Sequence, residues 1–335
     1  MTSRWRGSRA ARAGLSIVVA LAVFATIGPL VAPHDAFTSD FTNGVSPLHT
    51  PIGPSRHFWL GADRIYRDEF ARLAVGARLS LAIGMLATLL ATAIGATVGV
   101  VSGWFEGSEG TRIPWSIGIG SLGAVVLALA GHGGWAVLAI AIGLAVRVTG
   151  ELARIEPLKR GPRVNVDMLL MRMVDVGLAF PFLLLVMAIS AALDHTTATT
   201  VVLVLGATGW LGTARVLRAK TMQVRSLDFV LAARALGRST PGILLRHVLP
   251  NVSGVLAIAA TISVAQMILA ESILGYLGVG IAPPAPTWGR MLYEGQDYYL
   301  AGPWLVAAPA TAIIAAVLGF HLLGEGLKDA LGARD

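Results

Sequence analysis

The chain has 335 residues, of which 55% are hydrophobic and only 13% are charged. Soluble domains carry roughly 25% charged residues, so this composition excludes a soluble globular protein and indicates an integral membrane protein. The absence of cysteine excludes disulfides, thiolate catalysis and Cys-ligated metals. The net charge of +7 fits arginine and lysine held in cytoplasmic loops, so we expect no nucleic-acid partner.

The amino-terminal segment is basic and leads into a long apolar run at residues 14–32. A cleaved signal peptide has a similar layout, but this run is long, and Pro33 directly follows the nearest small-x-small cleavage site. We therefore expect an uncleaved first membrane span. Residues 33–77 are rich in Pro, Ser, Thr and Asp and predict an external loop, which becomes amphipathic over 68–81 and feeds an interfacial helix.

Apolar runs long enough to cross a hydrocarbon core of about 30 Å recur along the chain. They lie at residues 14–32, 79–103, 113–131, 135–150, 173–193, 199–215, 251–274 and 303–324. Most of the 26 arginines and lysines fall on the amino-terminal tail and in the segments after the even-numbered runs. Because basic loops stay in the cytoplasm, the sequence predicts an all-α polytopic membrane protein of about eight spans with both termini cytoplasmic.

Two of these runs carry signals of helix packing. Small residues recur every four positions in the second run, and they predict a helix–helix interface, with a pore lining as the alternative. These residues are Ala87, Ala91, Gly95, Gly99 and Gly103. In the fifth run, Pro181 predicts a kink, which membrane helices tolerate when neighbours satisfy the freed carbonyl.

A short, water-compatible segment separates the sixth and seventh runs. Its apolar residues at i, i+3, i+4 and i+7 predict one stripe on a helix too short to cross a bilayer. The stripe consists of Phe229, Ala232, Ala233 and Leu236. Gly237 can take the left-handed position that ends this helix, and Thr240 and Pro241 predict the N-cap and first residue of the next. Such a helix suits docking on a soluble partner; an ordinary loop helix is the alternative.

The sequence lacks the motifs of the common catalytic sites. A Walker A loop needs Gly-Lys-Ser/Thr, and none of the three lysines follows a glycine. The histidines are scattered without a zinc pair, and no Gly-x-Ser-x-Gly elbow occurs. We expect no ATP site, no metal and no cofactor, and hence not an enzyme. The intramembrane acids Asp175 and Glu271 could relay protons, but their places near the span ends favour a structural hydrogen-bonding role.

Several short motifs follow one another along the chain, and their order and spacing together carry a resemblance to a known family. The segment after the first run reads Leu60-Gly-Ala-Asp63, Arg67-Asp68, Arg72 and Gly76-Ala-Arg-Leu-Ser-Leu81. Further elements are Met171-Arg-Met-Val-Asp175, Phe180-Pro181, Ala232-Ala-Arg-Ala-Leu-Gly237, Arg246-His-Val-Leu-Pro250 and Pro283-Pro-Ala-Pro-Thr-Trp-Gly289. Together they resemble the permease subunits of the dipeptide/oligopeptide/nickel ABC importers, specifically the C-type partner of a B/C pair. The resemblance covers about residues 14–104 and 166–335.

This resemblance implies roles for individual residues. An ATPase-coupling helix and the turn after it would use Phe229, Ala232, Ala233, Arg234, Leu236, Gly237, His247, Leu249 and Pro250. The other family-motif positions are Gly61, Asp63, Arg67, Asp68, Arg72, Arg172, Asp175, Pro181, Glu271, Gly278, Gly280, Trp288 and Gly289. The chain departs from the family pattern at Tyr66, where a glycine is expected, at Leu231 in place of an acid, and at Gly332-Ala333 in place of Asp-Pro.

The resemblance also implies a fold and partners. We expect a type I ABC importer transmembrane domain over residues 79–335, preceded by a cytoplasmic tail, first span and external loop over 1–78. Residues 105–165, where the family has a short turn, predict an inserted two-helix hairpin, with a re-entrant or interfacial pair as the alternative. The expected partners are the lipid bilayer of a bacterial or archaeal cell (inner) membrane, a B-type permease, two ABC ATPases and an extracytoplasmic substrate-binding protein. The solutes would be peptides or related small molecules.

Two other classes of protein remain as alternatives. A stand-alone secondary transporter or channel would use Asp175 and Glu271 as coupling sites, but it should show inverted repeats, and none is visible in the sequence. A membrane-bound enzyme would need paired catalytic groups, which the sequence does not offer.

Overall fold

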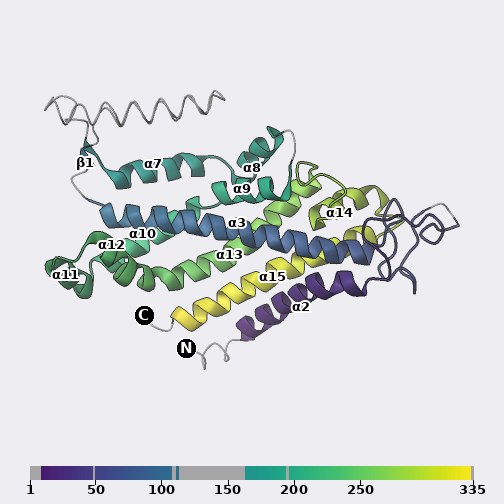
Figure 1. Ribbon diagram of the computed structural model, residues 1–335, viewed down its shortest axis with the longest axis horizontal. Helices are drawn as coiled ribbons and strands as arrows, with labels where there is room; N and C mark the ends of the chain where they lie inside the picture. Colours follow the sequence, from purple (N-terminus) through teal and green to yellow (C-terminus); the bar gives the residue numbers. More distant parts are fainter. Residues whose placement is uncertain (1–8, 48–49, 108–110, 113–162, 194–195, 333–335) are drawn as a thin grey trace. The chain divides into compact units, whose positions relative to one another are not determined.

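The computed structural model describes residues 9–47, 50–107, 111–112, 163–193 and 196–332 (Figure 1). The chain divides into two compact units, Met1–Val100 with Val174–Asp335, and Val101–Met173. Both segments of the first unit are mostly helical, so the expected all-α membrane fold is confirmed. The long helices are α2 (Arg9–Val31), α3 (Glu69–Phe105), α13 (Leu249–Tyr276) and α15 (Trp304–Gly332).

Five helical stretches among the described residues are long and apolar enough to cross a membrane, or six if one bent pair counts as a single span. They match six of the eight predicted runs. The remaining two, at 113–131 and 135–150, lie outside the described residues, so the count of eight stays a prediction. The sixth run is longer than expected because α9 (Ala198–Thr208) continues through Gly209 and Trp210 into α10 (Leu211–Arg225).

Helices α2 and α15 pack antiparallel through glycines. A Cβ on Gly14 would collide with the backbone of Leu323, and one on Gly326 would collide with Ala11. The two backbones therefore approach as closely as small residues allow, in the way helices associate in lipid. The start of α2 consequently lies beside the end of α15 (Figure 1).

Helix α3 corrects one expectation from the sequence. Residues 69–81 do not form a separate interfacial helix, because they are the first turns of one unbroken 37-residue helix. Asp68 caps it by accepting a hydrogen bond from the amide of Ala71 at 3.0 Å. The apolar face of these turns packs inside the protein, where Leu73 and Leu81 join Trp288 in a buried cluster. The domain boundary expected at residue 78 falls inside this helix.

The small-residue ridge of α3 is a helix–helix interface, as predicted. Ala87 and Ala91 are buried, and added Cβ atoms on Gly95 and Gly99 would lie 2.9 Å from Thr213 and 2.5 Å from the carbonyl oxygen of Ala214, both in α10. The predicted helix–helix interface is therefore confirmed over these four positions. Where Gly95 and Gly99 face α10, the two helices pack nearly backbone to backbone.

The predicted kink at Pro181 is confirmed as a sharp break. Helix α7 (Val166–Ala179) and helix α8 (Phe182–Ala191) meet at an angle of 84°. Proline lacks the amide that would continue the hydrogen-bond ladder, so the chain turns there. The same break gives two short helices where the sequence suggested one bent span.

The loop between α2 and α3 is irregular but internally bonded. Asp40 accepts hydrogen bonds from the side chain and amide of Asn43 and from the amide of Thr42, each at 2.9 Å. These bonds, led by that from the Asn43 side chain, lower the pKa of the Asp40 carboxyl. Gly61 has φ +83° and sits against the Trp304 ring, whose Nε1 donates to the carbonyl of Ala62 at 3.3 Å. The loop is thus tied to the start of α15.

A short strand pair belongs to the second unit. Strands β1 (Thr111–Arg112) and β2 (Arg163–Val164) are antiparallel, with Arg112 opposite Arg163. Nearby in the same unit, the Ser102 hydroxyl donates to the buried carboxyl of Asp167. The two ends of the segment 113–162 are therefore joined, while the hairpin expected within 105–165 lies largely outside the described residues.

The remaining elements lie between α10 and α15. They are α11 (Asp228–Ala235), α12 (Thr240–Ile243), the π-helical turn η1 (Leu244–Val248), α14 (Trp288–Gly295) and the 3-10 turn η2 (Gln296–Tyr298). In Figure 1, α11 and α12 lie at one end of the first unit, and α14 lies at the other, near the loop that precedes α3.

Candidate functional site

Helix α11 ends as the sequence predicts. Gly237 has φ +74°, its amide donates to the carbonyl of Arg234 at 3.0 Å, and the next amide, of Arg238, donates to Ala233 at 3.2 Å. This pair of bonds is a Schellman motif, which satisfies the last carbonyls of a helix and reverses the chain. The next helix begins one residue earlier than expected: Ser239, and not Thr240, is its N-cap, and no side-chain bond completes that cap.

The apolar stripe of α11 is open to solvent within this chain. Phe229 and Leu236 are 41% and 88% exposed, Ala232 is exposed and Ala233 is half-buried. The helix is held instead through Val230, which is fully buried and was not singled out in the sequence. A stripe that is apolar but uncovered is the surface a helix offers to a groove on another protein.

The turn after α11 contains a π-helix. Turn η1 spans Leu244–Val248 and runs directly into α13, with Val248 buried. The His247 ring lies 6.2 Å from the Phe229 ring, and the side-chain Nδ2 of Asn251 donates to the His247 backbone carbonyl at 2.7 Å. Leu249 and Pro250 follow at the exposed start of α13. These contacts bring together the two halves of the expected coupling segment, 228–237 and 247–250.

A buried charge cluster joins the outer loop to α14. Arg67 contacts Asp63 at 2.6 Å and Glu294 at 3.1 Å, and Arg72 contacts the same Glu294 oxygen at 2.7 Å. Arg290 adds a bond to the other oxygen of Glu294 at 3.0 Å. Buried charges are stable when each has a partner of opposite sign, and breaking such a network by removing one partner costs roughly 3–5 kcal/mol. The motif residues of 63–72 therefore act structurally, as a clamp on α14.

The carboxyl of Asp68 extends this cluster. It accepts from the amide of Ala71 and contacts the Nδ1 atom of His34 at 3.0 Å. The His34 ring in turn stacks on Phe58 with ring centroids 4.5 Å apart. The carboxyl of Glu69 is also buried and has one oxygen without a hydrogen-bond partner among the described residues.

Glu271 occupies a second buried polar site, between α13, α3 and α14. Its carboxyl lies among the hydroxyls of Ser80, Ser272 and Thr287. Thr287 caps α14 by accepting from the amide of Arg290 at 3.2 Å. The Oε2 atom of Glu271 and the Ser272 hydroxyl are nevertheless buried without a hydrogen-bond partner among the described residues, so the structural hydrogen-bonding role favoured from the sequence stays a prediction.

Trp288 and the motif glycines hold α14 against α13 and α3. The Trp288 ring is fully buried, and its Nε1 donates to the carbonyl of Leu73 at 3.2 Å. A Cβ on Gly289 would collide with the backbone of Ser272, and one on Gly280 would lie 2.7 Å from Gly275. Gly278 has φ +77° and ends α13. These positions therefore build the packing around α14.

Asp175 lies on α7 and pairs with Arg215 on α10, with 2.7 Å between Oδ1 and Nη2. Both side chains are about half exposed, at 52% and 57%. Arg172, one turn earlier on α7, is exposed. The structure therefore separates the motif residues into three places: the outer cluster, the α13–α14 contact and this ion pair.

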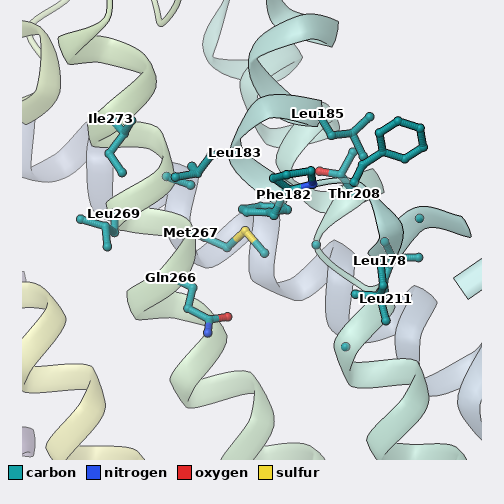
Figure 2. Close-up of a pocket in the computed structure, with 16 residues that line it drawn as sticks. Leu178, Phe182, Leu183, Leu185, Thr208, Leu211, Gln266, Met267, Leu269 and Ile273 are labelled. Carbon is teal, nitrogen blue, oxygen red and sulfur yellow. The ribbon is translucent and has the colours of Figure 1, made fainter. Parts of the chain in front are cut away.

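An apolar cleft of about 540 Å³ opens beside the Pro181 break (Figure 2). Helices α7, α8, α9, α10 and α13 supply its walls. Met267 points into it beneath Gly209, where a Cβ would collide with the methionine methyl group. The polar side chains on its walls are Thr208 and Gln266, and Gln266 is exposed near the middle of α13. Sequence reasoning missed this cleft, because one wall comes from α13 and the others from α7 to α10, and no local pattern connects them.

Glu294 and Arg290 were also missed. Arg67 and Glu294 are 227 positions apart, and neither lies in a recognisable catalytic pattern. The signal available was that Arg290 and Glu294, with Asp297, are the only Asp, Glu, Lys or Arg residues in the sequence between Glu271 and Glu325. No three His, Asp or Glu side chains in the described part of the chain converge as metal ligands.

Comparison with known proteins relates these features to a family. Residues 152–334 match the family described as "Binding-protein-dependent transport system inner membrane component". Residues 1–51 match the "N-terminal TM domain of oligopeptide transport permease C". The second match ends within the loop between α2 and α3, and the first begins beyond the end of α3.

Individual relatives align over nearly the whole chain. The "Oligopeptide transport system permease protein OppC" of Bacillus subtilis is 29% identical over 98% of this chain and 87% of its own length. The "Dipeptide transport system permease protein DppC" of the same species is 30% identical over 98% and 83%. The "Glutathione transport system permease protein GsiD" of Escherichia coli O6:H1 is 31% identical over 98% and 88%.

These comparisons give no support to a stand-alone secondary transporter or channel. In the structure, Asp175 is paired with Arg215, so its place is explained without a coupling ion. Family membership and apolar helices together indicate a multi-pass inner membrane protein. The chain belongs to the binding-protein-dependent transport system inner membrane components, as a C-type permease of the peptide ABC importers.

Proposed function

We propose that this permease forms half of a translocation pathway for small peptides or related solutes and has no ATP site of its own. The other half would come from a B-type permease, and two ABC ATPases and an extracytoplasmic binding protein would complete the importer. The relatives are named for oligopeptide, dipeptide and glutathione transport, which supports a peptide-sized solute. The absence of any Gly-Lys pair in the sequence supports ATP hydrolysis by separate subunits.

The ATPase would dock on α11 and the turn that follows it. The observation that carries this proposal is the uncovered apolar stripe of α11, anchored from behind by Val230. The π-turn η1 continues without a loop into α13, so a displacement of α11 reaches a membrane span directly. Coupling through such a contiguous element is what an ATP-driven permease requires.

The arrangement of the first unit supports both termini on the ATPase side. The start of α2 lies beside the end of α15, and Figure 1 places these ends toward α11. Basic residues concentrated in 215–246 agree with a cytoplasmic face there. We further propose that the tail, first span and external loop end at Asp68, directly before α3 begins. Residues 69–335 would carry the transmembrane domain, with 105–165 as an inserted hairpin.

Substituting Ala233→Asp tests the docking site. A carboxylate inside the stripe would be buried without a partner on the ATPase, at a cost of roughly 3–5 kcal/mol. Co-purification of the ATPase and ATP-dependent uptake in proteoliposomes should both fall steeply. Ala235→Asp is the matched control, because Ala235 is an exposed alanine of the same helix outside the stripe. Uptake by Ala233→Asp equal to that of Ala235→Asp would reject α11 as the docking helix.

A backbone series at Gly237 gives an independent measurement. No atom lies within 4 Å of a Cβ added there, so substitutions act through the positive φ alone. Gly237→Asn should retain most ATPase binding, because asparagine tolerates the left-handed region, whereas Gly237→Val should lose it. Equal binding by the two variants would contradict the proposed role of this chain reversal.

A further inference from the structure

The ion pair between Asp175 and Arg215 lies at one end of the apolar cleft. Helix α7 lines the cleft with Gly177 and Leu178, and Asp175 precedes Leu178 by one turn. Helix α10 lines it with Leu211 and Gly212, and Arg215 follows Leu211 by one turn. Because α10 runs from the cleft toward α11, the pair lies at the docking-helix end.

The two helices touch closely at this point. A Cβ on Gly177 would lie 2.6 Å from the Leu211 side chain, and Figure 2 shows Leu178 and Leu211 together at the edge of the cleft. The ion pair is the next contact beyond them, at 2.7 Å. The contact between α7 and α10 therefore includes an apolar contact and, beyond it, an ion pair.

The exposure of this pair distinguishes it from the outer charge cluster. Asp175 and Arg215 are each about half exposed, whereas the charges around Glu294 are buried. A half-exposed ion pair adds little net stability and exchanges easily with water. Such a pair does little to hold the two helices together permanently, but it can form and break within a transport cycle.

Each partner is also attached to an element that can move. Arg215 lies on α10, which leads through Ser226 and Leu227 into α11. Asp175 lies on α7, which ends at the 84° break and is not continuous with α8. A displacement of α11 therefore displaces Arg215 on α10, while the break between α7 and α8 allows Asp175 on α7 to keep its position.

We propose that Asp175 and Arg215 form an ion-pair gate that closes the docking-helix end of the cleft until α11 moves. This inference rests on the proposed function, because α11 must be the ATPase-docking helix. When the pair separates, the apolar cleft opens toward the ATPase side and solute can leave. When it re-forms, the cleft is closed against backflow.

Cross-linking the gate tests this directly. The native chain has no cysteine, so Asp175→Cys/Arg215→Cys can be joined selectively by a short, reductant-cleavable bismaleimide. In the assembled transporter in proteoliposomes, ATP-dependent uptake of radiolabelled dialanine should fall to the ATP-free level and return after reduction. Unchanged uptake in the cross-linked transporter would overturn the gate. Failure of the wild-type complex to show ATP-driven uptake would instead count against the proposed function.

Charge reversal provides the second arm and a rescue. Asp175→Arg should repel Arg215 and raise passive efflux of preloaded dialanine without ATP, by up to about fivefold for an exposed pair. Asp175→Arg/Arg215→Asp should restore a tight membrane, because the swapped charges can pair again. A gate predicts that the single reversal changes efflux while the unfolding temperature stays near wild type, whereas a purely structural pair predicts that the two change together. Efflux that is unchanged in the single reversal, or that stays high in the double reversal, would also overturn the gate.

Discussion

Tyr66 adopts a left-handed backbone conformation, which is energetically unfavourable for any residue with a side chain. Its φ of 66° lies in the left-handed region, where a non-glycine residue loses roughly 1–2 kcal/mol. Its backbone carbonyl accepts from the amide of Asp40 at 2.9 Å, and its ring packs edge-on against Phe41 at 5.5 Å. An aromatic contact of this kind is worth about 0.5–1.5 kcal/mol, which offsets much of the backbone cost.

A comparison of two substitutions at this residue isolates the backbone cost. Tyr66→Gly and Tyr66→Ala both lose the ring contact, but only glycine relieves the positive φ. We expect Tyr66→Gly to be more stable than Tyr66→Ala by about 1 kcal/mol, measured by thermal unfolding of the purified transporter. Equal midpoints for the two variants would show that Tyr66 is not strained.

Three residues show which structural features could be predicted from the sequence and which could not. Tyr66 was noticed only as a departure from a family pattern, and its φ explains why glycine belongs there. Gly237 could be predicted because chain reversal after a helix has a local signature. Glu294 could not, because its partners Arg67 and Arg72 lie more than two hundred positions away and no local rule connects them.

At the scale of the helices, α3 packs closely against α10 at Gly99. Gly99→Val would drive a side chain into the backbone carbonyl of Ala214, 2.5 Å from an added Cβ. Overpacking of this kind costs roughly 1–3 kcal/mol and should separate α3 from α10. We expect a lower unfolding temperature and weaker ATPase co-purification.

Ala93→Val is the matched control for this interface. Ala93 lies on the same helix but is exposed among the described residues, so a valine there has room that Gly99 lacks. It should leave the unfolding temperature and ATPase co-purification near wild type. A loss equal to that of Gly99→Val would locate the effect in valine's helix propensity, and not in the contact with α10.

The helical elements were predictable where a side-chain pattern had one structural meaning. Proline at 181 and small residues every four positions from Ala87 have few other uses, and both predictions held. The interfacial helix at 68–81 was wrong because amphipathic spacing is the same whether a helix lies on a bilayer or packs on neighbouring helices. Only the tertiary contacts of Leu73 and Leu81 decide between them.

At the scale of the whole molecule, the ends of the inserted segment are already joined. Arg112 and Arg163 face each other in an antiparallel pair, which a two-residue Asn-Gly turn can close. Replacing residues 113–162 by Asn-Gly should therefore leave membrane insertion, ATPase co-purification and unfolding temperature near wild type. Loss of all three would show that the segment contributes to the fold of the remaining chain.

Helix α3 runs without a proline from the outer charge cluster at Glu69 to the α10 contact at Gly99. At 1.5 Å per residue, this stretch is about 45 Å long, well beyond the apolar thickness of a bilayer. A continuous hydrogen-bonded rod of that length shifts or tilts as one body. A load on the clamp at Arg72 is therefore felt beside Ala214, and, by reciprocity, work done on α10 is available at Glu69. With an ATPase docked on α11 as proposed, the permease would pass its internal state along α3 to the loop that precedes it.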